Sequence, residues 1–385
     1  MSKADPGIWH DQRRMLPPLT VGLMIGGFYV TAAGSLIATL SRDLRVSPAS
    51  LAFLGSAFGV GMLVSGLAAP FLLRYGPVWN LRFAPLLAAI GTLLTLWSLN
   101  AAVAITGVTL ACFGATLVTS AVAGTFTGVE GGKYLALVNG VSSAVSILTT
   151  ILIALVERLF PGFGRFAVLF AFIAIIPTFI LAWRLPAVPF ATFIKPLKAV
   201  EESPAEVTRK APKSLLAWQI VRLILVAGVE FAMYAWAVTR LQQVGLDLAA
   251  ASAFATAFAV GMALGRIFGA RFTALRPAWY VFLALGALGT ALTAYSPLTW
   301  SVTGGLVLAG LGVSCLYPIG ASEFSGLPGV KAHNAAGVIS ILSGTGALVT
   351  PLLLGILLNA IGLQMSFAVL LVFYAVLLVI PRPRG

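Results

Sequence analysis

Residues 17–40, PPLTVGLMIGGFYVTAAGSLIATL, form a continuous apolar segment without Asp, Glu, Lys, Arg or His. About 20 helical residues are needed to cross a hydrocarbon layer roughly 30 Å thick, since each residue rises about 1.5 Å. The segment is long enough for this crossing. Its apolar residues are continuous rather than alternating, which favours a helix over a strand. The segment therefore predicts a membrane-spanning helix.

The same pattern recurs along the whole chain, which is 59% hydrophobic and 9% charged, with a mean hydropathy of +1.02. A soluble domain carries about 25% charged residues. In lipid every backbone amide needs an internal partner, which leaves only helices or a closed barrel. We therefore predict an all-α membrane protein. Its twelve transmembrane helices are expected at about residues 17–40, 48–73, 78–99, 101–123, 134–157, 165–185, 215–239, 248–271, 278–295, 297–321, 334–358 and 362–380.

One long polar segment, about residues 186–214, separates the sixth span from the seventh. It is rich in Lys, Glu and Pro, a composition typical of linkers. We predict an N-terminal six-helix bundle at residues 1–185, a cytoplasmic linker at 186–214 and a C-terminal six-helix bundle at 215–385.

Two short patches repeat at one offset of 200 residues, from 57 to 257 and from 77 to 277. Residues 57–62 read AFGVGM and residues 257–262 read AFAVGM, while PVW at 77–79 returns as PAW at 277–279. Two matches at one offset, including Phe, Met, Pro and Trp, indicate a parallel repeat of two six-helix units.

The basic residues indicate the orientation of the chain. If the N-terminus is cytoplasmic, five basic residues lie outside, namely Arg42, Arg45, Arg158, Arg165 and Arg240. Arg222 lies within a span, and all remaining Lys and Arg residues lie on the cytoplasmic side. Cytoplasmic segments normally carry this excess. We therefore predict a multi-pass protein of the bacterial inner (cell) membrane with both termini in the cytoplasm. The same rule accounts for the net charge of +13 without a nucleic-acid partner.

Twelve spans, two repeated halves, a charged linker and basic loops after the second span of each half resemble the major facilitator superfamily over nearly the whole chain. In that superfamily the loop after the second helix carries an acidic residue and a Gly-Arg-Arg cluster. Here Arg74 remains, but Leu73 stands at the acidic position, and the second copy retains Arg266 and adds Arg271. The resemblance implies a cytoplasmic gate that includes Arg74, Arg266 and Arg271. It also implies transport by alternating access around a central cavity lined by the first, fourth, seventh and tenth helices.

Two features of the superfamily's drug/proton antiporters are missing from this sequence. The fourth span has no arginine at residues 109–114, and the fifth has no proline at residues 139–146. Efflux of lipophilic compounds by proton antiport is therefore the weaker alternative, and it stays open beside an uncoupled facilitator.

Glu230 lies roughly 15 residues into the seventh span, deep in the apolar layer. A carboxylate at such depth costs about 2.5–3.5 kcal/mol, so it normally faces a cavity or a partner. Tyr234, four residues on, shares its helix face. We predict that Glu230 couples protons or binds substrate. The alternative is a structural carboxyl bonded to a neighbouring helix.

Arg222 is the second charge inside a span. It precedes Glu230 by eight residues, about 12 Å along a helix, so the two side chains cannot pair directly. Because Arg222 lies near the cytoplasmic end, we predict that its side chain extends to the membrane interface rather than binding substrate.

Other polar residues fall where a cavity would lie. Such groups in membrane helices more often bond to their own helix or to a neighbour than to a ligand. As further candidate substrate contacts we take Tyr29, Thr31, Thr116, Asn139 and Tyr317.

No nucleotide-binding Gly-x-x-x-x-Gly-Lys motif and no metal-ligand spacing occurs in the sequence. We predict no cofactor, no metal and no enzymatic activity. The predicted function is secondary active transport of a small organic solute, coupled to protons, by a functional monomer in the lipid bilayer. A sensor or an intramembrane enzyme is the alternative of a different class, and solute flux in a reconstituted system distinguishes them.

Overall fold

The computed structural model describes residues 6–72, 77–126, 128–185, 211–269, 272, 275–330 and 332–382, and no strand occurs in these ranges. Short 3₁₀ segments, η1 (Pro48–Leu51) and η3 (Gly164–Ala171), precede α2 and α6. The long helices are α1 (Pro6–Leu44), α2 (Ala52–Leu72), α3 (Pro77–Leu96), α4 (Ala101–Thr125), α5 (Gly128–Leu159), α6 (Phe172–Trp183), α8 (Lys213–Gln243), α9 (Leu248–Gly269), α10 (Arg276–Tyr295), α11 (Thr299–Ser325), α12 (Ala332–Ile361) and α13 (Leu363–Val379).

Within the described ranges, 11 helices are long and apolar enough to cross a membrane, and α13 is a shorter apolar helix. The predicted spans match these helices to within a few residues at most ends. The largest difference is at α1, which begins at Pro6 rather than near residue 17. Polar residues ended the predicted span, but a helix continues beyond the hydrocarbon where water can hydrate its side chains.

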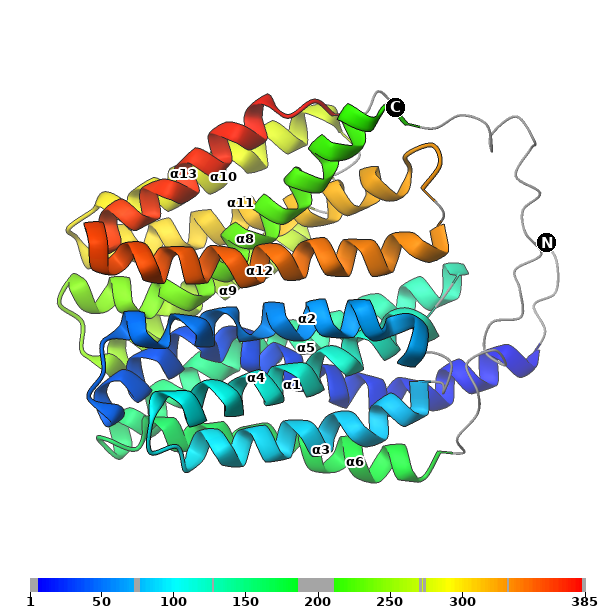
Figure 1. Cartoon of the computed structure of the whole chain (residues 1–385), viewed down its shortest axis with the longest axis horizontal. Coiled ribbons are helices and arrows are strands. Elements are labelled where there is room, and N and C mark those ends of the chain that lie inside the picture. The colour runs from blue at the N-terminus through cyan, green and yellow to red at the C-terminus, as the bar shows by residue number, and fades with distance from the viewer. Residues whose placement is uncertain are drawn as a thin grey trace.

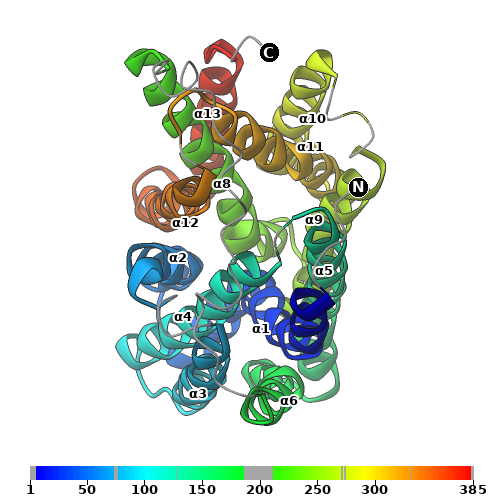
Figure 2. The same cartoon turned by 90° about the vertical axis from the view of Figure 1, so that its right-hand side faces the viewer.

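The helices run side by side along the molecule, with α1–α6 forming one half and α8–α13 the other (Figures 1 and 2). The end at which α1 begins and α13 finishes is called the terminal end, and the opposite end is called the far end. Figure 1 shows the terminal end at the right.

The sequence repeat is also a repeat of helix packing. In the first half Gly91 lies so close to α4 that a Cβ atom would collide with the backbone nitrogen of Ala111, and Gly289 stands in the same relation to Ala309 of α11. Glycine permits such close approach of membrane helices. The pairs α3–α4 and α10–α11 therefore pack in the same way.

The two halves meet through α1 with α8, α2 with α12, and α5 with α9. A Cβ atom on Gly34 would lie 2.6 Å from the carbonyl oxygen of Tyr234. Toward the far end, the hydroxyls of Thr150 in α5 and Thr256 in α9 lie 2.6 Å apart. These contacts hold the halves together on the far side of the molecule's centre.

Candidate functional site

Glu230 and Arg266 form an ion pair inside the membrane-spanning part of the second half. Glu230 Oε1 lies 3.6 Å from Arg266 Nη2, and the side chains are 15% and 46% exposed. The short connection between α8 and α9 brings them together. It turns at Gly245, which has φ of 97°, and Asp247 Oδ1 accepts a hydrogen bond from the Ala250 amide at 2.7 Å, as an N-cap does.

This pairing joins two residues that the sequence assigned to different sites. Arg266 was expected at the cytoplasmic gate and Glu230 in the central cavity. The backbones of the two residues lie at different depths in the membrane, but the arginine side chain is long enough to reach the carboxylate.

Arg266 also contacts the other half of the molecule. Its Nη1 donates to Ser143 Oγ of α5 at 3.5 Å, at the limit of a hydrogen bond. The guanidinium thus lies between a carboxylate of its own half and a hydroxyl of the partner half. Arg266 is therefore placed to respond to changes in either.

Two tyrosines complete the polar cluster around Glu230. Tyr234 packs edge-on against Phe258, with ring centroids 4.7 Å apart. The hydroxyl of Tyr317 in α11 lies 3.2 Å from that of Ser343 in α12. Both tyrosine hydroxyls are close enough to Glu230 to interact electrostatically with its carboxylate. The structure therefore brings Glu230, Tyr234, Arg266 and Tyr317 together.

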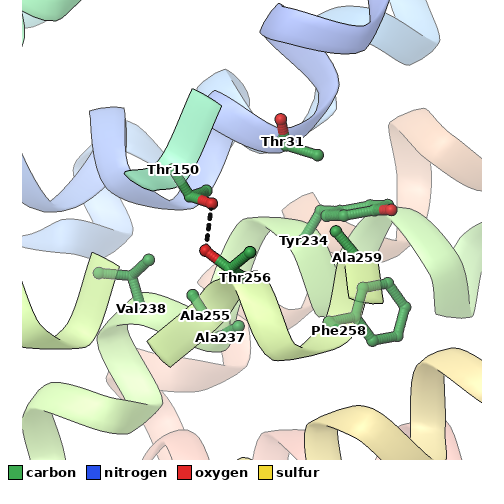
Figure 3. A pocket seen from close by; sticks show the side chains of 9 residues that line it. All are labelled: Thr31, Thr150, Tyr234, Ala237, Val238, Ala255, Thr256, Phe258 and Ala259. Atoms are coloured by element: carbon green, nitrogen blue, oxygen red, sulfur yellow. Dashed lines mark hydrogen bonds between the residues drawn. The ribbon is translucent and has the colours of Figure 1, made fainter. Parts of the chain in front are cut away.

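A small cavity lies next to this cluster, between the halves (Figure 3). Thr31 and Tyr234 line it, and the hydroxyl pair of Thr150 and Thr256 joins α5 to α9 at its edge. The cavity volume is about 10 Å³, which is about enough for a single water molecule. In this conformation the cavity admits no larger solute.

The remaining predicted contacts lie elsewhere. The hydroxyl of the buried Tyr29 lies 2.6 Å from that of Thr92 in α3. The buried Thr116 donates to the carbonyl of Phe113 at 2.9 Å. Asn139 is exposed on α5. Their predicted roles in binding stay predictions.

Arg74 and Arg271, predicted as parts of the gate, lie outside the described residues. Sequence reasoning missed Thr150, Thr256, Ser343 and Ser143 as part of the site. A threonine or serine in an apolar helix carries no sign of the face on which it lies.

The predicted extension of Arg222 to the membrane interface is wrong. Its side chain is 1% exposed and pairs with Glu323 of α11, and its guanidinium lies 3.6 Å from the ring centroid of Trp279. Arg382 pairs with the same carboxylate. Glu323, 101 positions further along the chain, balances the charge of Arg222 within the protein.

No group of three or more His, Cys, Asp or Glu residues that could hold a metal ion occurs among the described residues.

Solved structures with a similar architecture include several transporters. The chain is similar to a mutant of the nucleoside transporter NupG, with a TM-score of 0.73 and 14% identity over 94% of this chain and 97% of that one. It is also similar to a D-xylose-proton symporter, with a TM-score of 0.71 and 14% identity over 94% and 96%. A third is a bacterial homolog of the human lysosomal transporter Spinster, inward-facing and unoccupied, with a TM-score of 0.69 and 13% identity over 97% and 96%.

At identities this low, the structural similarity shows a common fold and no more. No curated protein matches the chain. A family model described as Major Facilitator Superfamily matches residues 19–335, which is most of the chain. The chain belongs to the Major Facilitator Superfamily of membrane transporters.

Proposed function

We propose that this protein is a proton-coupled secondary transporter of a small, polar, uncharged organic solute. It would work as a monomer in the bacterial inner (cell) membrane, with both termini in the cytoplasm. The halves at residues 1–185 and 215–385 would rock about the central site, joined by the linker at 186–214. The observation that supports this most strongly is the Glu230–Arg266 pair inside the spanning region of the second half, from which Arg266 reaches Ser143 of the first half.

The pair supports coupling because its charge state bears on the contact between the halves. Ionised Glu230 holds Arg266 by an ion pair, and Arg266 also reaches Ser143 in the partner half. When Glu230 takes up a proton, this attraction is lost and the guanidinium is free to move. An ionisable group within a membrane helix commonly marks a proton or substrate path.

The substrate class is inferred from the groups near the pair. Tyr234, Tyr317 and Ser343 offer hydroxyls, which donate and accept hydrogen bonds without charge. Hydroxyl groups of this kind suit a hydroxylated solute. Two of the similar structures are named for a nucleoside and for D-xylose with protons, and both solutes are rich in hydroxyl groups.

Two alternatives use the same site differently. In an uncoupled facilitator, Glu230 would bind solute without proton movement. In an exporter of lipophilic compounds, proton antiport through Glu230 would drive efflux.

The test is flux into liposomes that contain purified protein. An inside-alkaline pH gradient drives accumulation by symport, and an inside-acidic gradient drives accumulation by antiport. Labelled monosaccharides, nucleosides, amino acids, organic acids and lipophilic cations form the panel. We expect gradient-driven movement of one uncharged polar class, lost in Glu230→Gln and retained in the control Asp247→Asn, which changes a carboxyl at the far end.

Movement that depends equally on the gradient in wild type and Glu230→Gln would contradict the coupling role. Solute exchange without any response to the gradient would establish the facilitator. Movement of lipophilic cations alone would establish the exporter.

A further inference from the structure

A groove at the far end lies across the two halves and is separate from the Glu230 cluster. It is lined by Pro48 at the start of η1, by Thr239, Gln242 and Gln243 in the last turns of α8, and by Leu358 and Asn359 in the last turn of α12. The groove is open on one side rather than enclosed. Its volume is about 480 Å³, and small-molecule sites occupy roughly 300–1,000 Å³. The groove is therefore large enough for a small solute.

The lining indicates the chemistry of an occupant. None of the lining residues is ionisable, so the groove offers no counter-charge to an anion or a cation. The side chains of Gln242, Gln243 and Asn359 are amides, each of which both donates and accepts hydrogen bonds. Pro48 and Leu358 add apolar surface. This combination fits a neutral ring or chain with several hydroxyl groups.

The nearest cation of α8 is already engaged. Arg240 donates to the carbonyl oxygens of Thr293 at 2.8 Å and Ser296 at 2.7 Å, at the end of α10. Its charge is thus directed at the carbonyl end of a helix, where cations are favourable. It does not make the groove a site for anions.

Thr239 in the wall of the groove has an unsatisfied hydroxyl. The residue is 7% exposed, and its Oγ1 has no hydrogen-bond partner among the described residues. By contrast, Thr92 and Thr149 donate to the carbonyl one turn earlier in their helices. A buried polar group without a partner is costly. Threonine in a helix divides between two χ1 rotamers, and rotation exchanges its methyl and hydroxyl positions, so the hydroxyl can turn to an occupant.

We propose that this groove is a second binding site, for a neutral polyhydroxylated small molecule, at the end opposite to the termini. The proposal rests on the proposed function in that the occupant belongs to the transported class. Residues from both halves form the groove, so an occupant binds best while the far ends of the halves are together. Binding would then favour the conformation in which Thr150 meets Thr256.

Equilibrium binding of labelled myo-inositol and D-glucose to purified full-length protein in lipid nanodiscs tests the proposal. The protein carries Glu230→Gln, which disables the central pair but leaves the groove intact. We expect one bound probe per chain. Asn359→Leu should weaken binding at least about tenfold, and Thr239→Val roughly threefold to tenfold, as expected for losing one hydrogen bond. Thr106→Val is the matched control, since its hydroxyl bonds to the Ala102 carbonyl of its own helix at 2.8 Å.

Three outcomes would overturn the proposal. They are no binding of either neutral probe, equal binding with and without Asn359→Leu, and equally tight binding of the charged analogues gluconate and glucosamine. Failure of the proposed function shows differently, as wild-type flux that does not respond to the pH gradient or to Glu230→Gln.

Discussion

In the N-terminal half the described ion pairs lie at the far end of the helices, whereas in the C-terminal half they extend into the interior. Arg42 pairs with both Asp43 and Glu157 where α1 and α5 end. Glu230 lies well inside α8 and pairs with Arg266, which stands in the last turn of α9. The repeat therefore carries its charges at different depths in the two halves.

The packing of the halves differs far less than their charges. Gly91 and Gly289 make equivalent close contacts with the following helix. Close contact between backbones constrains side-chain size in both copies, while a charge is needed only where it does chemistry. Packing was thus retained in both copies, and the candidate chemistry lies mainly in the second.

Removal of the buried arginine should distinguish the halves most strongly. Arg222→Met leaves Glu323 with Arg382 alone and should cost about 3 kcal/mol, as does breaking a buried ion pair. Arg82→Met in the first half should cost about 1 kcal/mol, because Arg82 donates to the Leu185 carbonyl at 2.8 Å and contacts Trp79, which is 37% exposed. Unfolding in detergent measures both. Equal losses would show that the two tryptophan–arginine contacts are equivalent.

Substitution of the two equivalent glycines should destabilise both halves equally. Gly91→Ala and Gly289→Ala each place a Cβ atom against a helix backbone, and each should destabilise the protein by about 2 kcal/mol through overpacking. Thermal unfolding of the two variants is the measurement, with Gly304→Ala as the control because a Cβ atom there has nothing within 4 Å. A loss in one half alone would break the structural repeat.

The interior ion pair should matter for transport more than for folding. Arg266→Gln removes the charge that faces Glu230 and should lower gradient-driven uptake about tenfold or more. Since the arginine is 46% exposed, the free energy of unfolding should change little. Initial rates in liposomes and unfolding in detergent separate the two effects. Uptake at the wild-type rate would remove Arg266 from the site.

The smallest expected difference concerns two tyrosines. Tyr29→Phe removes the contact with Thr92 and should cost about 0.6–1 kcal/mol of stability, with transport unchanged. Tyr234→Phe should leave stability unchanged and weaken the apparent affinity for solute about threefold to tenfold. Paired unfolding and uptake measurements check both. Impaired transport in Tyr29→Phe would show that Tyr29 contributes to substrate binding after all.

The sequence predicts how deep in the membrane a residue lies better than it predicts which side of its helix the residue occupies. Apolar length alone located α2 and α9, and the insertion cost of a carboxylate singled out Glu230. Tyr29 was assigned to the cavity. Its hydroxyl lies 2.6 Å from that of Thr92 in α3, and its role in binding stays a prediction. A soluble helix shows its buried face by amphipathicity, but a helix in lipid is apolar all round, so its sequence does not show which side faces the cavity.

The pairings of charges were also beyond the sequence. Arg222 and Glu323 lie on helices whose contact depends on the whole C-terminal half. The family resemblance implied that Arg266 belongs to the gate, while its partner Glu230 lies on the preceding helix. Such contacts depend on tertiary packing and on the reach of long side chains.

The glycine contacts described above have a mechanical consequence. Two helix backbones that touch without side chains between them can move little relative to each other. We therefore expect α3 with α4, and α10 with α11, to move as rigid pairs. When a rigid helix pair tilts about the centre of the molecule, its two ends move by comparable amounts in opposite directions. An occupant that draws the far ends together would thereby spread the terminal ends, without any relay of side chains in between.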